Sequence, residues 1–212
     1  MKIQSFTFNS FQENTYILYD NSKECLIIDP GCYQEHEKET LISFIEENNL
    51  NPKKIINTHC HIDHVLGNNF CSKRWGLDIW ANKKEVSILK NNKNVASLYG
   101  MNEYEESPNI KRFLFDQDVL EFGQTKLKVI SAPGHSPGHI CLYHSLTESL
   151  ISGDVIFKQS IGRTDLPGGD FETLINSIKN KVLILHDNTK IFPGHGPSTK
   201  IGIEKNQNPF LQ

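Results

Sequence analysis

Three histidines and one aspartate lie within a single seven-residue run of this chain. The run reads THCHIDH, although the whole chain of 212 residues contains only nine histidines. In an extended segment the side chains of residues two apart face the same side, so His59 and His61 can bind one cation while Cys60 points the other way. If the chain turns after this pair, Asp63 and His64 reach a second cation. Imidazole with carboxylate is a ligand set typical of zinc, iron or manganese, and it leaves coordination positions open for chemistry.

Three further fragments each place one candidate ligand in a turn that follows a short apolar run. They read PGHSPG, SGD and PGHGP, and their candidate ligands are His135, Asp154 and His195. A strand that ends in a Gly/Pro turn presents such a side chain at the edge of a sheet, where loops on a rigid scaffold carry function. A lone histidine or a Gly-Asp turn is more often structural. The order and spacing of the fragments after the first run favour a shared metal centre.

Together these motifs resemble those of the metallo-β-lactamase-fold hydrolases. The string SIGRTDLPGGD at residues 160–170 is further similar to the glyoxalase II-like branch, which is related to the hydroxyacylglutathione hydrolases. The resemblance spans nearly the whole chain. It implies an α/β fold, the αβ/βα four-layer sandwich of two mixed β-sheets flanked by helices. It also implies one domain, residues 1–212, made of two similar halves at about 1–110 and 111–212.

The same resemblance implies a binuclear metallohydrolase with two divalent ions, zinc first, with iron or manganese also compatible. Three histidines are then expected to bind the first ion, two histidines and an aspartate the second, and one aspartate to bridge them. In that order these ligands are His59, His61 and His135; Asp63, His64 and His195; and Asp154. The two aspartates leave two of four positive charges uncompensated, which favours a bridging hydroxide. Because a bound cation lowers the pKa of water from about 15.7 to about 7, Asp63 and Asp154 are expected to act in catalysis through this metal-bound hydroxide.

The leaving group favours a thioester among the substrates that such a centre attacks. A thiolate, whose thiol has a pKa of about 8.5, departs unprotonated, whereas an amide nitrogen must first be protonated. The expected substrate is therefore a hydroxyacyl thioester similar to S-lactoylglutathione. Arg163 either steers an anionic substrate or anchors its own loop by pairing with a carboxylate, and the second role is favoured.

Full-length glyoxalase II carries a helical C-terminal region that holds glutathione. Only seventeen residues follow His195 in this chain, and they predict a short helix and a packing anchor. Recognition of glutathione is therefore open, and the compact glyoxalase II-like proteins are the better match.

Other functions remain open on the same residues. Persulfide dioxygenases share the fold and a similar Gly-Arg-Thr-Asp loop but use one iron, so metal count and oxygen uptake discriminate them from a hydrolase. Lactones and phosphodiesters are alternative substrates, because a fold does not determine a substrate. A β-lactamase of this fold commonly has a cysteine near the bridging position, where this chain has Asp154. A non-catalytic metal-binding protein is disfavoured by the complete ligand set.

The composition excludes some partners. With 22 basic and 25 acidic residues the net charge is -3, which indicates no nucleic-acid partner. The start MKIQSF has no apolar signal region and no stretch is long enough to span a membrane, so we expect a cytoplasmic protein that acts on a small molecule. The oligomeric state is not determined. The five scattered cysteines are expected to be reduced and mostly buried. The remaining histidines are predicted to be surface, structural or supporting residues: His36, His139, His144 and His186.

Hydrophobic periodicity predicts alternating strands and helices. The expected helices cover residues 35–48, about 65–75, 83–90 and 171–180. The expected strands cover residues 5–8, 15–19, 25–28, 54–57, 78–81, 111–115, 126–130, 140–144, 149–151 and 190–192. The polar segment 91–109 is predicted to be a loop, as a surface connection rather than a substrate lid.

Overall fold

The computed structural model describes residues 1–212, which divide into two compact units. Unit 1 comprises Met1–Phe113 and Glu121–Thr125, and unit 2 comprises Leu114–Leu120 and Lys126–Gln212. Each unit has a hydrophobic core of its own. That the two form a single domain stays a prediction.

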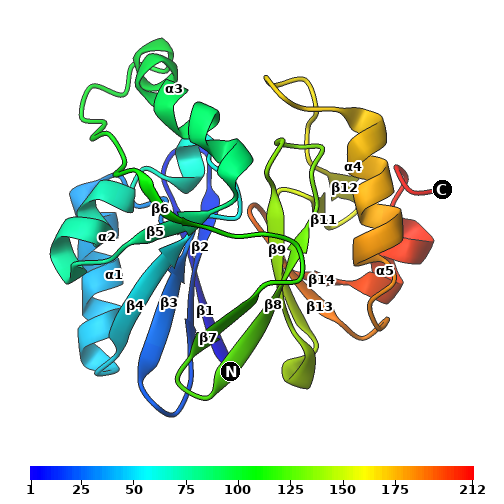
Figure 1. Ribbon diagram of the computed structural model, residues 1–212, viewed down its shortest axis with the longest axis horizontal. Helices are drawn as coiled ribbons and strands as arrows, with labels where there is room; N and C mark the ends of the chain where they lie inside the picture. Colours follow the sequence, from blue (N-terminus) through cyan, green and yellow to red (C-terminus); the bar gives the residue numbers. More distant parts are fainter. The chain divides into compact units, whose positions relative to one another are not determined.

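Unit 1 contains a mixed six-stranded sheet with the strand order β1-β2-β3-β4-β5-β6. The first three strands pair antiparallel and the others join in parallel. The strands are β1 (Lys2–Phe8), β2 (Glu13–Tyr19), β3 (Glu24–Ile28), β4 (Asn51–Ile56), β5 (Ile79–Ala81) and β6 (Ile110–Phe113). Helices α1 (Glu35–Glu47) and α2 (Asn68–Trp75) lie along this sheet in Figure 1. Leu41 of α1 and Cys71 of α2 are fully buried against strand residues such as Ile55, because each helix turns one apolar stripe toward the sheet.

Helix α3 (Val86–Leu98) shows that the predicted loop over 91–109 was wrong in its first part. The helix follows the short 3-10 turn η2 (Lys83–Glu85), and its buried side is formed by Leu89, Asn92 and Ala96 at helical spacing. Asparagine has a low intrinsic helix propensity, so the asparagine-rich segment concealed a helix that burial of this stripe stabilises. Residues 99–109 contain no helix or strand.

The sheet of unit 2 is also mixed, with the order β14-β13-β10-β9-β8-β7. Its strands are β7 (Val119–Phe122), β8 (Thr125–Ser131), β9 (Ile140–His144), β10 (Ser149–Gly153), β13 (Lys190–Pro193) and β14 (Thr199–Lys200). A separate hairpin joins β11 (Ile156–Phe157) and β12 (Ser160–Ile161).

Two helices accompany this second sheet in Figure 1. They are α4 (Phe171–Ser177), which continues into the π-helical turn η4 (Ile178–Val182), and α5 (Ile201–Gln207). Leu174 and Ile201 are buried in one cluster with Leu150 and Ile191 of the strands. Every predicted strand overlaps an observed one, whereas β7, β11, β12 and β14 were not predicted. The last three have two residues each, too few to show a period.

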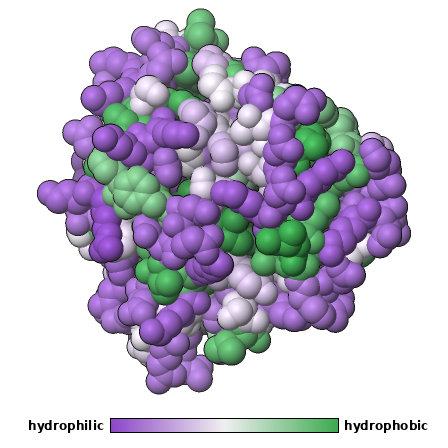
Figure 2. All heavy atoms as spheres, turned by 45° about the vertical axis from the view of Figure 1, so that its right-hand side comes forward, coloured by the Kyte–Doolittle hydropathy of each residue, from purple (hydrophilic) through white to green (hydrophobic).

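The surface is mostly hydrophilic and is broken by small apolar areas, as Figure 2 shows for one face. This agrees with a charged content of 22%. No helix is both long and apolar enough to cross a bilayer. All five cysteines are free and buried, which confirms the expectation that most of them are buried.

Candidate metal centre

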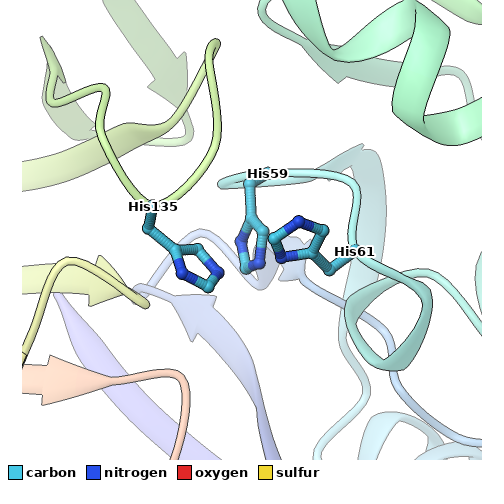
Figure 3. A group of neighbouring side chains, drawn as sticks. All are labelled: His59, His61 and His135. Carbon is cyan, nitrogen blue, oxygen red and sulfur yellow. The ribbon is translucent and has the colours of Figure 1, made fainter. Parts of the chain in front are cut away.

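The candidate ligands of unit 1 follow the carboxyl end of β4. The rings of His59 and His61 lie 4.8 Å apart between centroids and stand at 90° to each other. Figure 3 shows these two rings beside each other on their loop. Cys60 points away into a buried apolar cluster. Burial raises the pKa of its thiol well above the ordinary value, and the Glu85 carboxylate adds to this effect, so the thiol stays protonated and is unsuited to bind a metal.

The chain turns directly after His61 through the short 3-10 helix η1 (Ile62–His64). The turn brings Oδ2 of Asp63 to 3.6 Å from Nε2 of His64. The tip of the β1–β2 hairpin supports this turn, because the side-chain amide of Asn9 donates to the carbonyl of Asp63 at 3.0 Å.

Asp29, which lies outside the metal motifs of the sequence, organises the histidines of unit 1. It follows β3, the parallel neighbour of β4, so both loops leave the same edge of the sheet. Thr58 donates its N–H to Oδ1 of Asp29 at 2.7 Å and its hydroxyl to Oδ2 at 2.6 Å, and Nδ1 of His64 lies 3.2 Å from Oδ2. Since the Thr58 proton is committed to Asp29, its oxygen accepts from Nδ1 of His59, 3.2 Å away. Nε2 of His59 and of His64 is therefore the nitrogen left for a cation.

Unit 2 supplies the other three candidates from turns at one edge of its sheet. Strands β10 and β13 are parallel neighbours, with Gly153 opposite Pro193, so Asp154 and His195 leave from adjacent carboxyl ends. Strand β8 is antiparallel to β9, which is antiparallel to β10, and so the turn that carries His135 lies at the same edge.

The carboxylate of Asp154 lies between the two histidines of unit 2. Its Oδ2 atom is 3.6 Å from Nε2 of His135 and 3.5 Å from Nε2 of His195. Two ligand atoms that bind one tetrahedral cation at about 2.1 Å lie about 3.4 Å apart. Each pair therefore has a separation at which its two atoms can bind the same cation. The N–H of Asp154 donates to Nε2 of the fully buried His139 at 3.0 Å, which holds its backbone.

The Gly-Arg-Thr-Asp loop contacts this group through its backbone. Nδ1 of His135 donates to the carbonyl of Arg163 at 2.7 Å, which leaves Nε2 for a cation. A Cβ atom on Gly162 would lie 1.9 Å from the carbonyl oxygen of Asp154, so only glycine fits there. The guanidinium of Arg163 donates twice to Asp165, both times at 2.7 Å, and these bonds lower the pKa of that carboxyl to about 2. The side chain thus anchors its loop, and a substrate contact of Arg163 stays a prediction.

Glu13, like Asp29, lies near the histidines of unit 1 and has no role assigned from sequence. Glu13 is fully buried, and its Oε1 lies 3.9 Å from Nδ1 of His64. Burial raises the pKa of Glu13 well above its ordinary value, while His64 opposes the shift. Neither Glu13 nor Asp29 belongs to a metal motif, so only their burial in the folded chain marks them.

The histidines that sequence analysis kept outside the centre have different roles. His36 is exposed, and His186 pairs with Glu148 at 3.1 Å on the surface. His144 accepts the N–H of Thr147 at 3.2 Å and so caps a 3-10 turn. His139 is the supporting residue described above.

Within unit 1 the structure thus brings together His59 with His61 and Asp63 with His64, and within unit 2 it brings together His135, Asp154 and His195. Their assignment as ligands of two particular cations is a prediction.

Comparisons with known proteins bear on the family. The Metallo-beta-lactamase superfamily matches residues 9–195. Hydroxyacylglutathione hydrolase GloC of Haemophilus influenzae is 38% identical over 218 residues, which cover 100% of this chain and 98% of that protein.

Two solved structures are similar over the same length. The BLEG-1 B3 metallo-beta-lactamase has a TM-score of 0.91 at 35% identity and covers 100% of both chains. TTHA1623 in a di-iron-bound form has a TM-score of 0.88 at 33% identity, covering 98% of this chain and 100% of that one. The expected fold class, two mixed sheets flanked by helices, is thereby confirmed. The chain belongs to the metallo-beta-lactamase superfamily.

Proposed function

We propose that this protein is a hydrolase that binds two divalent cations and cleaves a hydroxyacyl thioester similar to S-lactoylglutathione. The observation that carries the proposal is the single oxygen of Asp154 that lies at ligand–ligand distance from both His135 and His195. The similarity to hydroxyacylglutathione hydrolase GloC over the whole chain supports the substrate class.

The candidate ligands of the two units act together in this proposal. Three histidines bind one cation, two histidines and an aspartate bind the other, and one carboxylate is shared. In that order they are His59, His61 and His135; Asp63, His64 and His195; and Asp154. The similarity to a di-iron-bound form of TTHA1623 supports two metals and keeps iron beside zinc and manganese as the native ion.

The cations, when bound, supply a hydroxide nucleophile at neutral pH and polarise the substrate carbonyl. The chain itself presents the Nε2 atoms of three histidines, because Thr58, Asp29 and Arg163 accept from the Nδ1 atoms of the histidines they contact. Asp63 and Asp154 offset only part of the positive charge of the cations, so the metal centre stays electrophilic. No general acid is required for a thiolate leaving group.

Elemental analysis of the purified protein tests the proposal when it is combined with a substrate panel. The panel contains S-lactoylglutathione, a lactone, a phosphodiester, a cephalosporin, and glutathione persulfide with an oxygen electrode. We expect about two metal ions per chain and fastest turnover of the thioester. One iron per chain with oxygen uptake on the persulfide would instead identify a dioxygenase.

Replacement of His61 by alanine removes one proposed ligand and leaves its neighbours in place. We expect kcat/KM for the thioester to fall at least about 100-fold, because loss of a ligand weakens metal binding more than loss of a supporting contact does. His186→Ala is the matched control, since His186 is exposed and pairs with Glu148 on the surface. Equal activity of wild type and His61→Ala would refute the proposed centre.

Hydrolysis of β-lactams is a second candidate function. The similarity to the BLEG-1 B3 metallo-beta-lactamase at 35% identity favours it, and the same nucleophile attacks a strained amide. The substrate panel distinguishes the two candidate functions. Faster turnover of the cephalosporin than of the thioester would support hydrolysis of β-lactams.

A further inference from the structure

The peptide groups on both sides of Cys60 are held by two buried side chains. Oε2 of Glu85 accepts the N–H of Cys60 at 2.8 Å, and the side-chain amide of Asn92 donates to its carbonyl at 3.0 Å. Glu85 is 0% exposed and Asn92 is 2% exposed. Both contacts therefore form away from competing water.

These two hydrogen bonds act on different peptide planes. The N–H of Cys60 belongs to the planar link with His59, whereas its carbonyl belongs to the planar link with His61. Fixing both planes restricts the backbone rotations next to each histidine. The backbone from which both imidazoles project is thus restrained at the residue between them.

The support is rigid because both side chains come from one helical segment. Glu85 ends η2 and Asn92 lies in α3, seven residues later, which places both on the same helical face. A hydrogen bond to a carboxylate is stronger than one between neutral groups. Burial of a carboxylate is costly unless such bonds compensate it. The hydrogen bond from the Cys60 N–H therefore stabilises the buried side chain of Glu85.

We propose that Glu85 and Asn92 form a clamp on the Cys60 peptides that orients His59 and His61 for the first cation. They are positioning residues, and helix α3 is the scaffold of that half of the centre. The proposal rests on the metal site of the proposed function and does not depend on which substrate is cleaved.

Binding of Co²⁺ to the full chain after removal of metal by a chelator tests the clamp, with calorimetry and the visible cobalt spectrum as readouts. Glu85→Leu and Asn92→Leu each remove one hydrogen bond. We expect each substitution to weaken binding of the more tightly held Co²⁺ ion about 10- to 100-fold and to alter the absorption bands of that ion. Glu85→Gln keeps a carbonyl acceptor and should recover most of the affinity.

Lys90→Gly is the matched control, because it destabilises the same helix by about 1 kcal/mol at an exposed position without contacting Cys60. Its melting temperature should fall while Co²⁺ affinity stays within twofold of wild type. The clamp is refuted if the leucine variants bind Co²⁺ like wild type, or if Lys90→Gly weakens binding as much as they do. If a leucine variant does not fold, Asn92→Ala, which removes the amide donor without adding bulk or charge, decides in its place and should bind at least tenfold more weakly.

Wild-type protein that binds two Co²⁺ but cleaves no thioester would overturn the proposed function and leave the clamp measurable through affinity. Wild-type protein that binds no Co²⁺ would overturn the clamp.

Discussion

Three candidate histidines each have a partner at Nδ1, and the three partners differ from one another in chemical kind. His59 contacts the Thr58 hydroxyl, His64 the Asp29 carboxylate, and His135 the backbone carbonyl of Arg163. Each partner selects the same tautomer, so Nε2 is presented in every case. Ligands that are already oriented lose little freedom when a cation binds, which raises metal affinity without any further contact.

At the same scale, Gly162 is expected to be irreplaceable. In Gly162→Ala the new Cβ would overlap the carbonyl oxygen of Asp154, 1.9 Å away, and also approach His135. We expect a loss of about 1–3 kcal/mol in the free energy of unfolding, as for other overpacked sites, together with reduced metal content. Denaturant unfolding and elemental analysis measure the two effects.

Gly76→Ala is the control for this substitution. Gly76 has φ +66° and open space around it, so alanine there meets backbone strain of about 1 kcal/mol but no neighbour. It should lower stability and leave metal content unchanged. Normal metal content in Gly162→Ala would show that the close approach to Asp154 is unimportant.

At the scale of elements, the candidate ligands are placed by strand ends. Asp154 and His195 follow adjacent parallel strands, and Asp29 and His59 follow another adjacent parallel pair. The C-terminal helix α5 supports the loop that leads to Gly162, because buried Glu204 accepts the N–H of Gln159 at 2.8 Å. The tail is therefore the packing anchor that its sequence predicts.

Two turns of unit 1 are joined by Asp20, and this link should depend on pH. Burial opposes ionisation of Asp20, but hydrogen bonds from Ser22, Thr125 and Gln124 outweigh it and lower its pKa to about 2. Since the folded pKa lies below the unfolded value of 3.8, its stabilising contribution is complete above about pH 4 and is lost as the pH falls toward 2.

We expect Asp20→Asn to melt lower than wild type at pH 7, and the difference to shrink between pH 4 and pH 2. Thermal melts followed by circular dichroism at several pH values measure it. A difference that is constant over this range would contradict the assignment.

At the scale of the whole molecule, each unit has its own core and contributes its own part of the candidate ligand set. Side chains such as Asp29 and Glu13 are buried close to histidines, which is costly for a folded chain without compensating charge. Cations that bound only the folded chain would offset this cost.

Removal of metal is therefore expected to destabilise the protein. At a metal concentration about 100 times Kd, binding contributes about 2.7 kcal/mol. For a chain of this size that corresponds to roughly 5–10 °C in melting temperature. Melting of metal-loaded and chelator-treated protein measures the shift, and His61→Ala should show a smaller one. A chelator without effect on the melting temperature of wild type would argue against two bound cations.

The candidate ligands could be predicted from sequence because each lies in a short motif that follows an apolar run, and three of the four motifs contain a Gly turn. These runs are read as strands from their apolar residues, since β10 is buried along its whole length and shows no polar alternation. By contrast, α3 was truncated in the prediction, since its asparagines are poor helix formers and only the buried Leu89, Asn92 and Ala96 hold it.

By itself, the sequence determined which residue types are available for metal chemistry and the family to which the chain belongs. Only the tertiary structure decided which side chains support them: Asp29 under His64, His139 under Asp154, and Glu85 with Asn92 around Cys60. The physical reason is that a buried polar group must find its hydrogen-bond partner in space, and packing, not distance along the chain, decides which partner that is.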